Sequence, residues 1–211
     1  MKRELLTLYL VMGSQNCHRD PRHVLREAIE GGITLFQFRE KGTGCLVDSE
    51  KQTLARDLLS ICREHQIPFI VNDDIELALE IGADGVHIGQ EDEPLDLVRE
   101  KIGKKLLGVS AHNVVEAFAA MAGGADYLGV GPIYATTTKT DIREVKGPEV
   151  IEEIRKAGLT IPIVGIGGIT AERVEDVRKA GADGVAVISA ISQAVSPRYS
   201  TGKILMEVKK S

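Results

Sequence analysis

The chain has 211 residues, of which 43% are hydrophobic, and a formal net charge of −5. This length suits one large core or two small ones, no apolar stretch approaches the ~20 residues of a membrane span, and the lack of basic runs argues against general nucleic-acid binding. Three scattered cysteines without a C-x-x-C pair indicate a reduced, cytoplasmic protein rather than a disulfide or zinc scaffold.

Short β-branched runs alternate with amphipathic segments along the whole chain. The β-branched runs predict strands over 6–12, 34–40, 68–72, 85–89, 106–110, 127–131, 162–166 and 184–188. Helical patterns lie between and after them, over 21–30, 48–65, 74–81, 95–101, 114–122, 148–157, 171–180 and 199–209. Several strands, such as 163–166 and 185–188, are apolar at nearly every position, which is typical of parallel strands buried on both faces.

The tripeptide Gly-Ala-Asp recurs at 82–84, 124–126 and 181–183, each time after a helical pattern and before a strand. Its glycine is suited to end a helix in the left-handed conformation before a short turn into the sheet. Because one helix-to-strand connection repeats, we expect residues 1–211 to form a single α/β domain, a closed (β/α)8 TIM barrel. An open, doubly wound sheet is the alternative.

Functional side chains of such a barrel gather at the C-terminal ends of its strands. Gln37, Arg39 and Lys41 stand at every second position along the second strand, so their side chains are expected to point the same way. Two cations and an amide on one face suit an oxyanion such as a phosphate. A solvated edge strand is the alternative explanation of the same pattern.

Asp73 and Asp92 follow the third and fourth strands, which are neighbours in a barrel, so their carboxylates are placed to share one cation. Oxygen ligands without a His or Cys cluster favour Mg²⁺, which usually takes one or two carboxylates together with substrate phosphates. Each aspartate taken alone is better explained as a cap of the helix that follows it, whereas the pair, facing the cationic strand, favours the metal.

A second phosphate site is predicted after the last two strands. Residues 167–170, Gly-Gly-Ile-Thr, resemble the glycine-rich turn of phosphate-binding barrels, and Ile188 with Ser189 takes the matching place after the eighth strand. Backbone N–H groups at such turns bind a phosphate dianion. A tight turn that needs glycine only for its flexibility is the alternative.

The segment 135–147 is the longest loop, and its hydroxyl groups with Lys139 suit a cover that closes over phosphates. A loop without function is the alternative. Two histidines have competing interpretations. His112 stands at a helix entry, where a structural role competes with general acid–base catalysis, and His87 lies inside a strand, where we expect it to be packed.

Eight short motifs occur in order: QFREK at 37–41, ND at 72–73, HIGQED at 87–92, GVSAH at 108–112, GVGPIY at 129–134, the Thr-rich loop with Lys139, GIGGI at 165–169 and ISAI at 188–191. In this combination the chain resembles the thiamine-phosphate synthase family over essentially its full length. Phe38 and Ala135 depart from the Leu and Pro that are usual in the family, and neither position has a charged role.

The resemblance implies a transferase of thiamine biosynthesis that joins 4-amino-2-methyl-5-hydroxymethylpyrimidine diphosphate to 4-methyl-5-(2-hydroxyethyl)thiazole phosphate and requires Mg²⁺. It implies that Asp73 and Asp92 hold Mg²⁺ and that Gln37 contacts the pyrimidine. The residues implied to hold the diphosphate are Arg39, Lys41, Asn72, Ser110 and Lys139, of which all but Asn72 are the implied catalytic residues. Those implied to take the thiazole phosphate are Thr136, Thr138, Gly168 and Ser189, with Ile188 as a further substrate-binding residue.

The chemistry accords with these residues. Diphosphate leaves from a carbon next to an electron-rich aminopyrimidine, so a dissociative path through a pyrimidine cation is expected. Positive groups then stabilise the leaving diphosphate, and no protein nucleophile is needed.

Two other functions stay open. A related thiazole tautomerase shares the barrel and would use His112 for proton transfer, but it needs neither the aspartate pair nor a diphosphate clamp. A non-catalytic sensor of phosphate ligands would bind without turnover. The expected partners are small-molecule substrates, without nucleic acid or membrane, and the sequence leaves the oligomeric state open, a homo-oligomer included.

Overall fold

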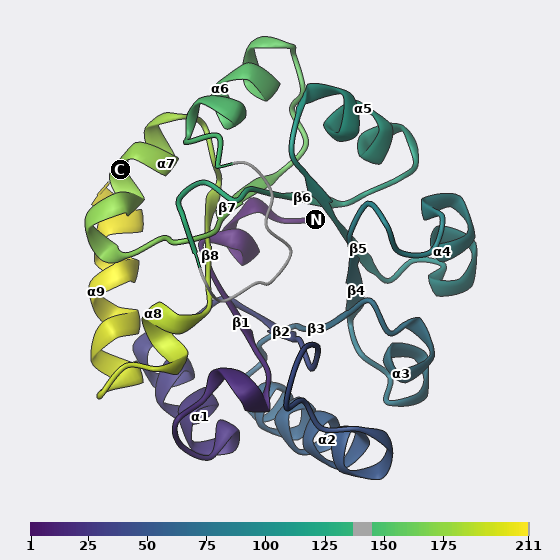
Figure 1. The fold of residues 1–211 in the computed structure, drawn as a ribbon, viewed down its shortest axis with the longest axis vertical. Helices are drawn as coiled ribbons and strands as arrows, with labels where there is room; N and C mark the ends of the chain where they lie inside the picture. The colour runs from purple at the N-terminus through teal and green to yellow at the C-terminus, as the bar shows by residue number, and fades with distance from the viewer. Residues whose placement is uncertain (137–144, 211) are drawn as a thin grey trace.

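The computed structural model describes residues 1–136 and 145–210. Within these residues, eight parallel strands pair in chain order and close into a barrel through the pairing of β1 with β8. Figure 1 shows the strands at the centre and the helices in a ring around them. The predicted (β/α)8 barrel is therefore confirmed, and the open-sheet alternative is wrong.

Each strand lies within or close to a predicted range. The strands are β1 (Leu8–Met12), β2 (Leu35–Phe38), β3 (Phe69–Asn72), β4 (Gly85–Ile88), β5 (Leu106–Ala111), β6 (Tyr127–Val130), β7 (Ile163–Ile166) and β8 (Gly184–Val187). The first strand is shorter than predicted, because Leu6 ends a 3-10 turn, η1 (Arg3–Leu6), instead of beginning the strand.

The helices also follow the predicted order. They are α1 (Pro21–Gly31), α2 (Asp48–Glu64), α3 (Ile75–Glu80), α4 (Leu95–Ile102), α5 (Val114–Ala122), α6 (Glu149–Lys156), α7 (Val174–Lys179), α8 (Ser189–Ser192) and α9 (Pro197–Lys210), with a 3-10 turn η2 (Ser14–Asn16) after β1. The predicted helix 171–180 divides into η3 (Ala171–Arg173) and α7. Helix α8 was not predicted, because four residues are too few to show a helical period. Among the described residues, no helix combines the length and the apolar character that crossing a membrane requires.

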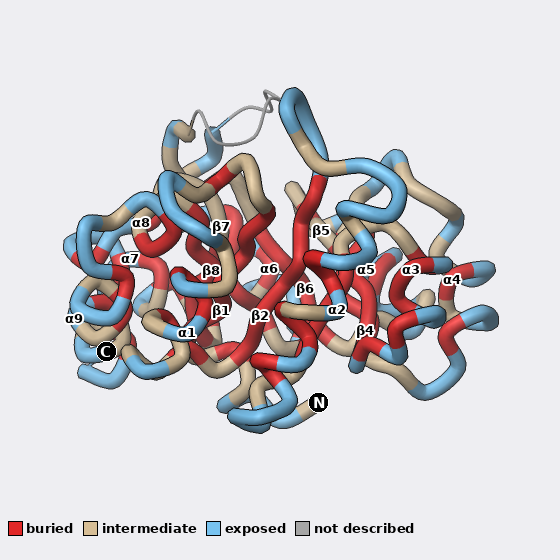
Figure 2. Tube along the Cα trace, turned by 90° about the horizontal axis from the view of Figure 1, so that it is seen from below, coloured by how far each residue is buried: buried red, intermediate tan, exposed pale blue. Residues whose placement is uncertain are grey.

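The core has two layers, one inside the barrel and one between the barrel and its helices. All five residues of β1 are buried. Leu8, Leu10 and Met12 pack outward against the helices, whereas Tyr9 and Val11 belong to the smaller interior cluster. Figure 2 shows the buried chain concentrated in the strands. Burial on both faces explains why the strands are nearly continuous apolar runs.

The three Gly-Ala-Asp copies form the helix-to-strand turns that were predicted for them. Gly82, Gly124 and Gly181 have φ values of +71°, +88° and +103°. This left-handed conformation strains residues that carry a Cβ, so glycine is the residue that suits each of these helix ends.

The aspartate of each copy has a further role that the sequence did not reveal. It accepts a hydrogen bond from a backbone N–H near the start of the preceding strand. The three bonds are Phe69 N to Asp84 Oδ2 at 2.8 Å, Leu107 N to Asp126 Oδ2 at 2.9 Å, and Ile163 N to Asp183 Oδ2 at 2.8 Å. At the N-terminal face of the barrel, the same contact thus links three pairs of neighbouring strands. The opposite face carries the polar strand ends described below.

Candidate active site

A cavity of about 1230 Å³ opens at the C-terminal ends of the strands. Ligand pockets in proteins commonly measure about 300–1,000 Å³, so the cavity has room for two small molecules. The predicted site residues that line it are Arg39, Lys41, Asn72, Asp73, Asp92, Ser110, Thr136, Gly168, Ile188 and Ser189. Side chains from loops far apart in the sequence therefore meet at one cavity, as expected.

Among the described residues, Gln37 is the predicted site residue that does not line the cavity. Gln37 lies in the barrel interior, where it is 4% exposed and its Nε2 donates to the Tyr9 hydroxyl at 2.7 Å. It belongs to β2 itself, so its side chain follows the strand into the core, whereas Arg39 and Lys41 come after the strand end. Thr138 and Lys139 lie outside the described residues, together with most of the predicted covering loop.

Lys41, Asp73 and Asp92 form a charged cluster at the cavity. Lys41 Nζ is 2.6 Å from Asp73 Oδ2 and 3.9 Å from Asp92 Oδ1. Asp73 has a φ of +62°, an uncommon conformation for a residue with a side chain, and its N–H donates to His87 O at 2.9 Å. This backbone geometry at the end of β3 aims the carboxylate toward the neighbouring loop.

Neither aspartate of the pair caps a helix, so that alternative is wrong. Asp74 is the residue that caps α3, because its side chain accepts a hydrogen bond from Leu77 N at 2.9 Å. Asp92 Oδ2 accepts from Gly89 N at 2.6 Å inside the turn that follows β4. Oδ1 of Asp92 and Oδ2 of Asp73 face Lys41.

The environment shifts the pKa values of these two carboxyl groups in opposite directions. Burial is the largest influence on Asp73 and, with the neighbouring Asp92, raises its pKa above the ordinary value against the effect of Lys41. Burial also acts to raise the pKa of Asp92, but the Gly89 N–H, Asp73 and Lys41 outweigh it and lower the pKa. Two carboxylates that are costly to ionise together favour a shared proton or a bound cation.

This donor set fits Mg²⁺ better than a transition metal. Asp73 and Asp92 offer hard oxygen ligands only. The described residues contain no group of three or more His, Cys, Asp or Glu side chains placed to hold a metal. Oxygen atoms of a substrate would therefore have to complete the coordination of a cation at this pair.

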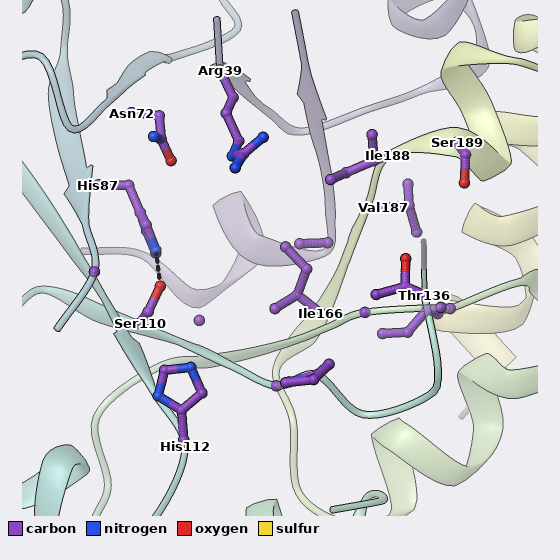
Figure 3. Close-up of a pocket in the computed structure, with 18 of the residues that line it drawn as sticks. Arg39, Asn72, His87, Ser110, His112, Thr136, Ile166, Val187, Ile188 and Ser189 are labelled. Atoms are coloured by element: carbon purple, nitrogen blue, oxygen red, sulfur yellow. Dashed lines mark hydrogen bonds between the residues drawn. The ribbon is translucent and has the colours of Figure 1, made fainter. Parts of the chain in front are cut away.

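Arg39 provides the strongest sign of an anion site. Its residue is only 7% exposed, and no hydrogen bond or ion pair to its guanidinium is found among the described residues. Arg39 lines the cavity, and a cation that is largely shielded from bulk water and faces a cavity suits an anionic ligand. In Figure 3, Arg39 and Asn72 lie on the same side of the cavity as His87 and Ser110.

Thr136 and Ser189 lie at the other side of the cavity in Figure 3, with Val187 beside Thr136, and Ile166 and Ile188 lie between the two polar groups. The cavity thus has two polar ends and an apolar middle. Such an arrangement suits two anionic groups held apart by flat, mostly apolar rings.

Gly168 and Arg173 complete the second polar end. A Cβ on Gly168 would lie 2.6 Å from the carbonyl oxygen of Ala135, and the residue has a φ of +61°, so the turn requires glycine. Arg173 lines the cavity, donates through an Nη atom to Gly168 O at 2.6 Å and stacks over the Tyr134 ring at 4.6 Å. The role of Arg173 was not predicted, because a single Arg in a short helical segment has the pattern of an ordinary surface residue.

The two histidines differ in their surroundings. His112 Nδ1 is 2.7 Å from Glu116 Oε2, and its backbone N–H donates to the same oxygen, which favours the structural role at the start of α5. His87 is buried in β4 as predicted, but it also lines the cavity and its Nε2 is 3.0 Å from Ser110 Oγ. Its contact with the cavity was not predicted.

Comparison with known proteins gives a consistent result. The family model described as "Thiamine monophosphate synthase" matches residues 8–191. The chain is 58% identical over 207 residues to a thiamine-phosphate synthase of Geobacillus kaustophilus, covering 98% of this chain and 94% of that protein. It is 57% identical over 208 residues to one of Bacillus cereus, covering 99% and 95%. A solved thiamine phosphate pyrophosphorylase from Pyrococcus furiosus superposes with a TM-score of 0.88 at 34% identity, covering 99% of this chain and 98% of that one.

Proposed function

This chain belongs to the thiamine monophosphate synthase family and is a transferase of thiamine biosynthesis, and from that premise we propose how its cavity performs the reaction. The substrates are the pyrimidine diphosphate and the thiazole phosphate named above, and the products are thiamine phosphate and diphosphate. The observation that carries the proposal is the buried Arg39, which lies without a described partner in the same cavity as Lys41 and the aspartate pair.

The diphosphate binds at the end of the cavity that Arg39, Lys41, Asn72 and Ser110 line. Arg39 offers a planar fork of donors that matches phosphate oxygens, and Lys41 adds a mobile point charge. When bound at Asp73 and Asp92, Mg²⁺ would supply further positive charge to the leaving group. Together these groups stabilise negative charge that grows on the diphosphate as it departs.

The thiazole phosphate binds at the opposite end, near Thr136, Gly168 and Ser189. Backbone N–H groups and hydroxyls at the turns after β7 and β8 suit a phosphate dianion. Ile188 and the other apolar residues between the two ends cover the rings and keep water from the reacting carbon.

The reaction exchanges one bond for another without a protein nucleophile. The bond between the pyrimidine methylene carbon and the diphosphate oxygen breaks, and its electron pair leaves with the diphosphate. The thiazole ring nitrogen then donates its lone pair to the cationic carbon and forms the new carbon–nitrogen bond. The protein's part is to hold the two rings in line and to stabilise the leaving group.

The test is to mix the purified protein with both heterocycles, with and without Mg²⁺, and to measure thiamine phosphate and released diphosphate. The proposal expects both products only when both substrates and Mg²⁺ are present. Binding without release would instead support a phosphate sensor. Proton exchange on the thiazole substrate without coupling would support the tautomerase.

Two arginine variants sharpen this test. Arg39→Gln removes the buried cation and is expected to lower kcat/KM by about 10²–10³-fold, as deletions of comparable electrostatic contacts do. Arg56→Gln is the matched control, because Arg56 is exposed and pairs with Glu80 at 2.6 Å far from the cavity lining. Equal activity of the two variants would remove Arg39 from the diphosphate site.

A further inference from the structure

A chain of polar side chains crosses the otherwise apolar barrel interior and ends at the cavity. Gln37 Nε2 donates to the Tyr9 hydroxyl at 2.7 Å, and the hydroxyls of Tyr9 and Tyr127 are 2.8 Å apart. The Tyr127 hydroxyl is 3.2 Å from His87 Nδ1. His87 Nε2 is 3.0 Å from Ser110 Oγ, the contact drawn as a dashed line in Figure 3. We call these five residues the interior polar chain.

The neighbouring strands leave space for this chain. A Cβ on Gly108 would lie 2.2 Å from Tyr127 Cζ and 2.4 Å from His87 Nδ1. A Cβ on Gly129 would lie 3.0 Å from His87 Cε1. Glycine at these two positions of β5 and β6 therefore gives the tyrosine and the histidine room to meet, at the expense of side chains that would otherwise fill the barrel.

The orientation of the Gln37 amide, which donates to Tyr9, implies one direction for the hydrogens along the chain. Burial raises the pKa of both Tyr9 and Tyr127 above the ordinary value, so each phenol keeps its single hydrogen at neutral pH. Tyr9 accepts from Gln37, and in the described part of the protein the acceptor left for its own hydrogen is Tyr127. Tyr127 then donates to His87, since a buried hydroxyl hydrogen without an acceptor is costly.

The consequence concerns the imidazole. A ring nitrogen that accepts a hydrogen bond carries no hydrogen, so Nδ1 of His87 is unprotonated and Nε2 holds the hydrogen of the neutral ring. His87 Nε2 therefore donates to Ser110 Oγ. A serine oxygen that accepts from His87 keeps its own hydrogen for another partner.

We propose that the interior polar chain holds His87 as the Nε2–H tautomer and thereby turns the hydroxyl hydrogen of Ser110 toward the cavity. Ser110 lines the same cavity as Arg39, and a phosphate oxygen, which only accepts, suits this hydrogen. The identity of that anion rests on the proposed function. Tyr9, Tyr127 and His87 are then positioning residues that act through Ser110.

The direct test reads the tautomer in the unliganded, full-length protein. Long-range proton–nitrogen NMR spectra of the ¹⁵N-histidine-labelled protein distinguish the two ring nitrogens, and the chain has only 5 histidines to assign. We expect an unprotonated Nδ1 and a protonated Nε2 for His87, whose signals are identified by their loss in His87→Gln. A hydrogen on Nδ1, with or without one on Nε2, would overturn the proposal. This measurement needs no substrate, so it stands even if the proposed function fails.

A binding experiment tests the consequence at Ser110. Calorimetry with inorganic diphosphate and Mg²⁺ is expected to show about tenfold weaker binding for Ser110→Ala and a smaller loss, about threefold or more, for Tyr127→Phe. In the double variant, Tyr127→Phe should add nothing to the loss from Ser110→Ala, because the tyrosine acts through that serine. Additive losses would overturn the proposal.

Controls separate positioning from a general effect on the fold. Tyr199→Phe removes a hydroxyl from an exposed tyrosine of α9 and should bind diphosphate like the unmodified protein. Thermal unfolding shows whether each variant folds, and the NMR measurement decides the proposal should Tyr127→Phe not fold. If the unmodified protein itself does not bind diphosphate with Mg²⁺, the proposed function fails and the NMR result alone decides the tautomer.

Discussion

Lys41 Nζ lies 2.6 Å from Asp73 Oδ2 and 3.9 Å from Asp92 Oδ1, so one ammonium faces two carboxylates that come from neighbouring loops. The lysine balances part of the negative charge of the pair. A cation bound at the same pair would leave Lys41 available to a phosphate oxygen, and the proposed metal and diphosphate sites would then share one small cluster.

The adjacent residues Asp73 and Asp74 are expected to have separable roles. Asp73→Ala removes a proposed Mg²⁺ ligand, and we expect kcat/KM to fall by about 10²–10³-fold with little loss of stability. Asp74→Ala removes the cap of α3 and should cost about 1 kcal/mol of unfolding free energy while activity is retained. Activity assays at several Mg²⁺ concentrations and urea denaturation measure the two effects. A fully active Asp73→Ala variant would contradict the assignment.

The raised pKa of Asp73 predicts how stability depends on pH. The unfolded chain loses the proton of Asp73 near pH 4, whereas the folded protein keeps it to a higher pH. Between the two pKa values the folded state binds more protons, so the stability of the unmodified protein should fall, relative to Asp73→Asn, as the pH rises through this window. Urea denaturation of both proteins from about pH 3 to pH 8 measures the difference.

Asp74→Asn is the matched control for that experiment. Burial acts to raise the pKa of Asp74, but hydrogen bonds from Lys51 and Leu77 outweigh it and lower the pKa. The unmodified protein should therefore gain stability relative to Asp74→Asn as the pH rises toward about 4, and the advantage should be complete above it. Slopes of the same sign for the two variants would show that the environment of Asp73 is misassigned.

Arg173 is expected to serve the second phosphate. Arg173→Gln should raise KM for the thiazole phosphate about tenfold or more, since it removes a charged donor and the support of Gly168 O. KM for the pyrimidine diphosphate should change little. Arg63→Gln is a suitable control, because Arg63 makes the same kind of contact, with Gly82 O at 3.0 Å, away from the cavity lining. An equal rise in both KM values would argue against this assignment.

The repeated Gly-Ala-Asp contact is expected to stabilise the barrel without affecting catalysis. Asp84→Ala leaves the Phe69 N–H without its acceptor and should cost about 1–3 kcal/mol of unfolding free energy. Asp84→Asn keeps an oxygen acceptor and should recover part of that loss. Denaturation curves measure both, and kcat/KM per folded molecule should match that of the unmodified protein. A stability unchanged in Asp84→Ala would show that the contact is weak.

Much of this site follows from the sequence because a parallel barrel brings the C-terminal ends of all its strands to one face. Once the alternation of strands and helices predicted the barrel, residues after the strands, such as Arg39, Asp92 and Ser189, had to lie at the same end of it. The sequence also predicted the short turns between helices and strands, as the left-handed conformation of Gly82 shows.

What the sequence alone determined was therefore the fold, the family and the face at which the cavity opens. Tertiary structure decided which of two adjacent aspartates caps a helix, that Gln37 turns into the core, and that Arg173 reaches the cavity. It alone joined Tyr9 to Tyr127, which are 118 residues apart in the chain. Periodicity and local propensity act over a few residues, whereas such contacts form only when the barrel closes, so no local pattern encodes them.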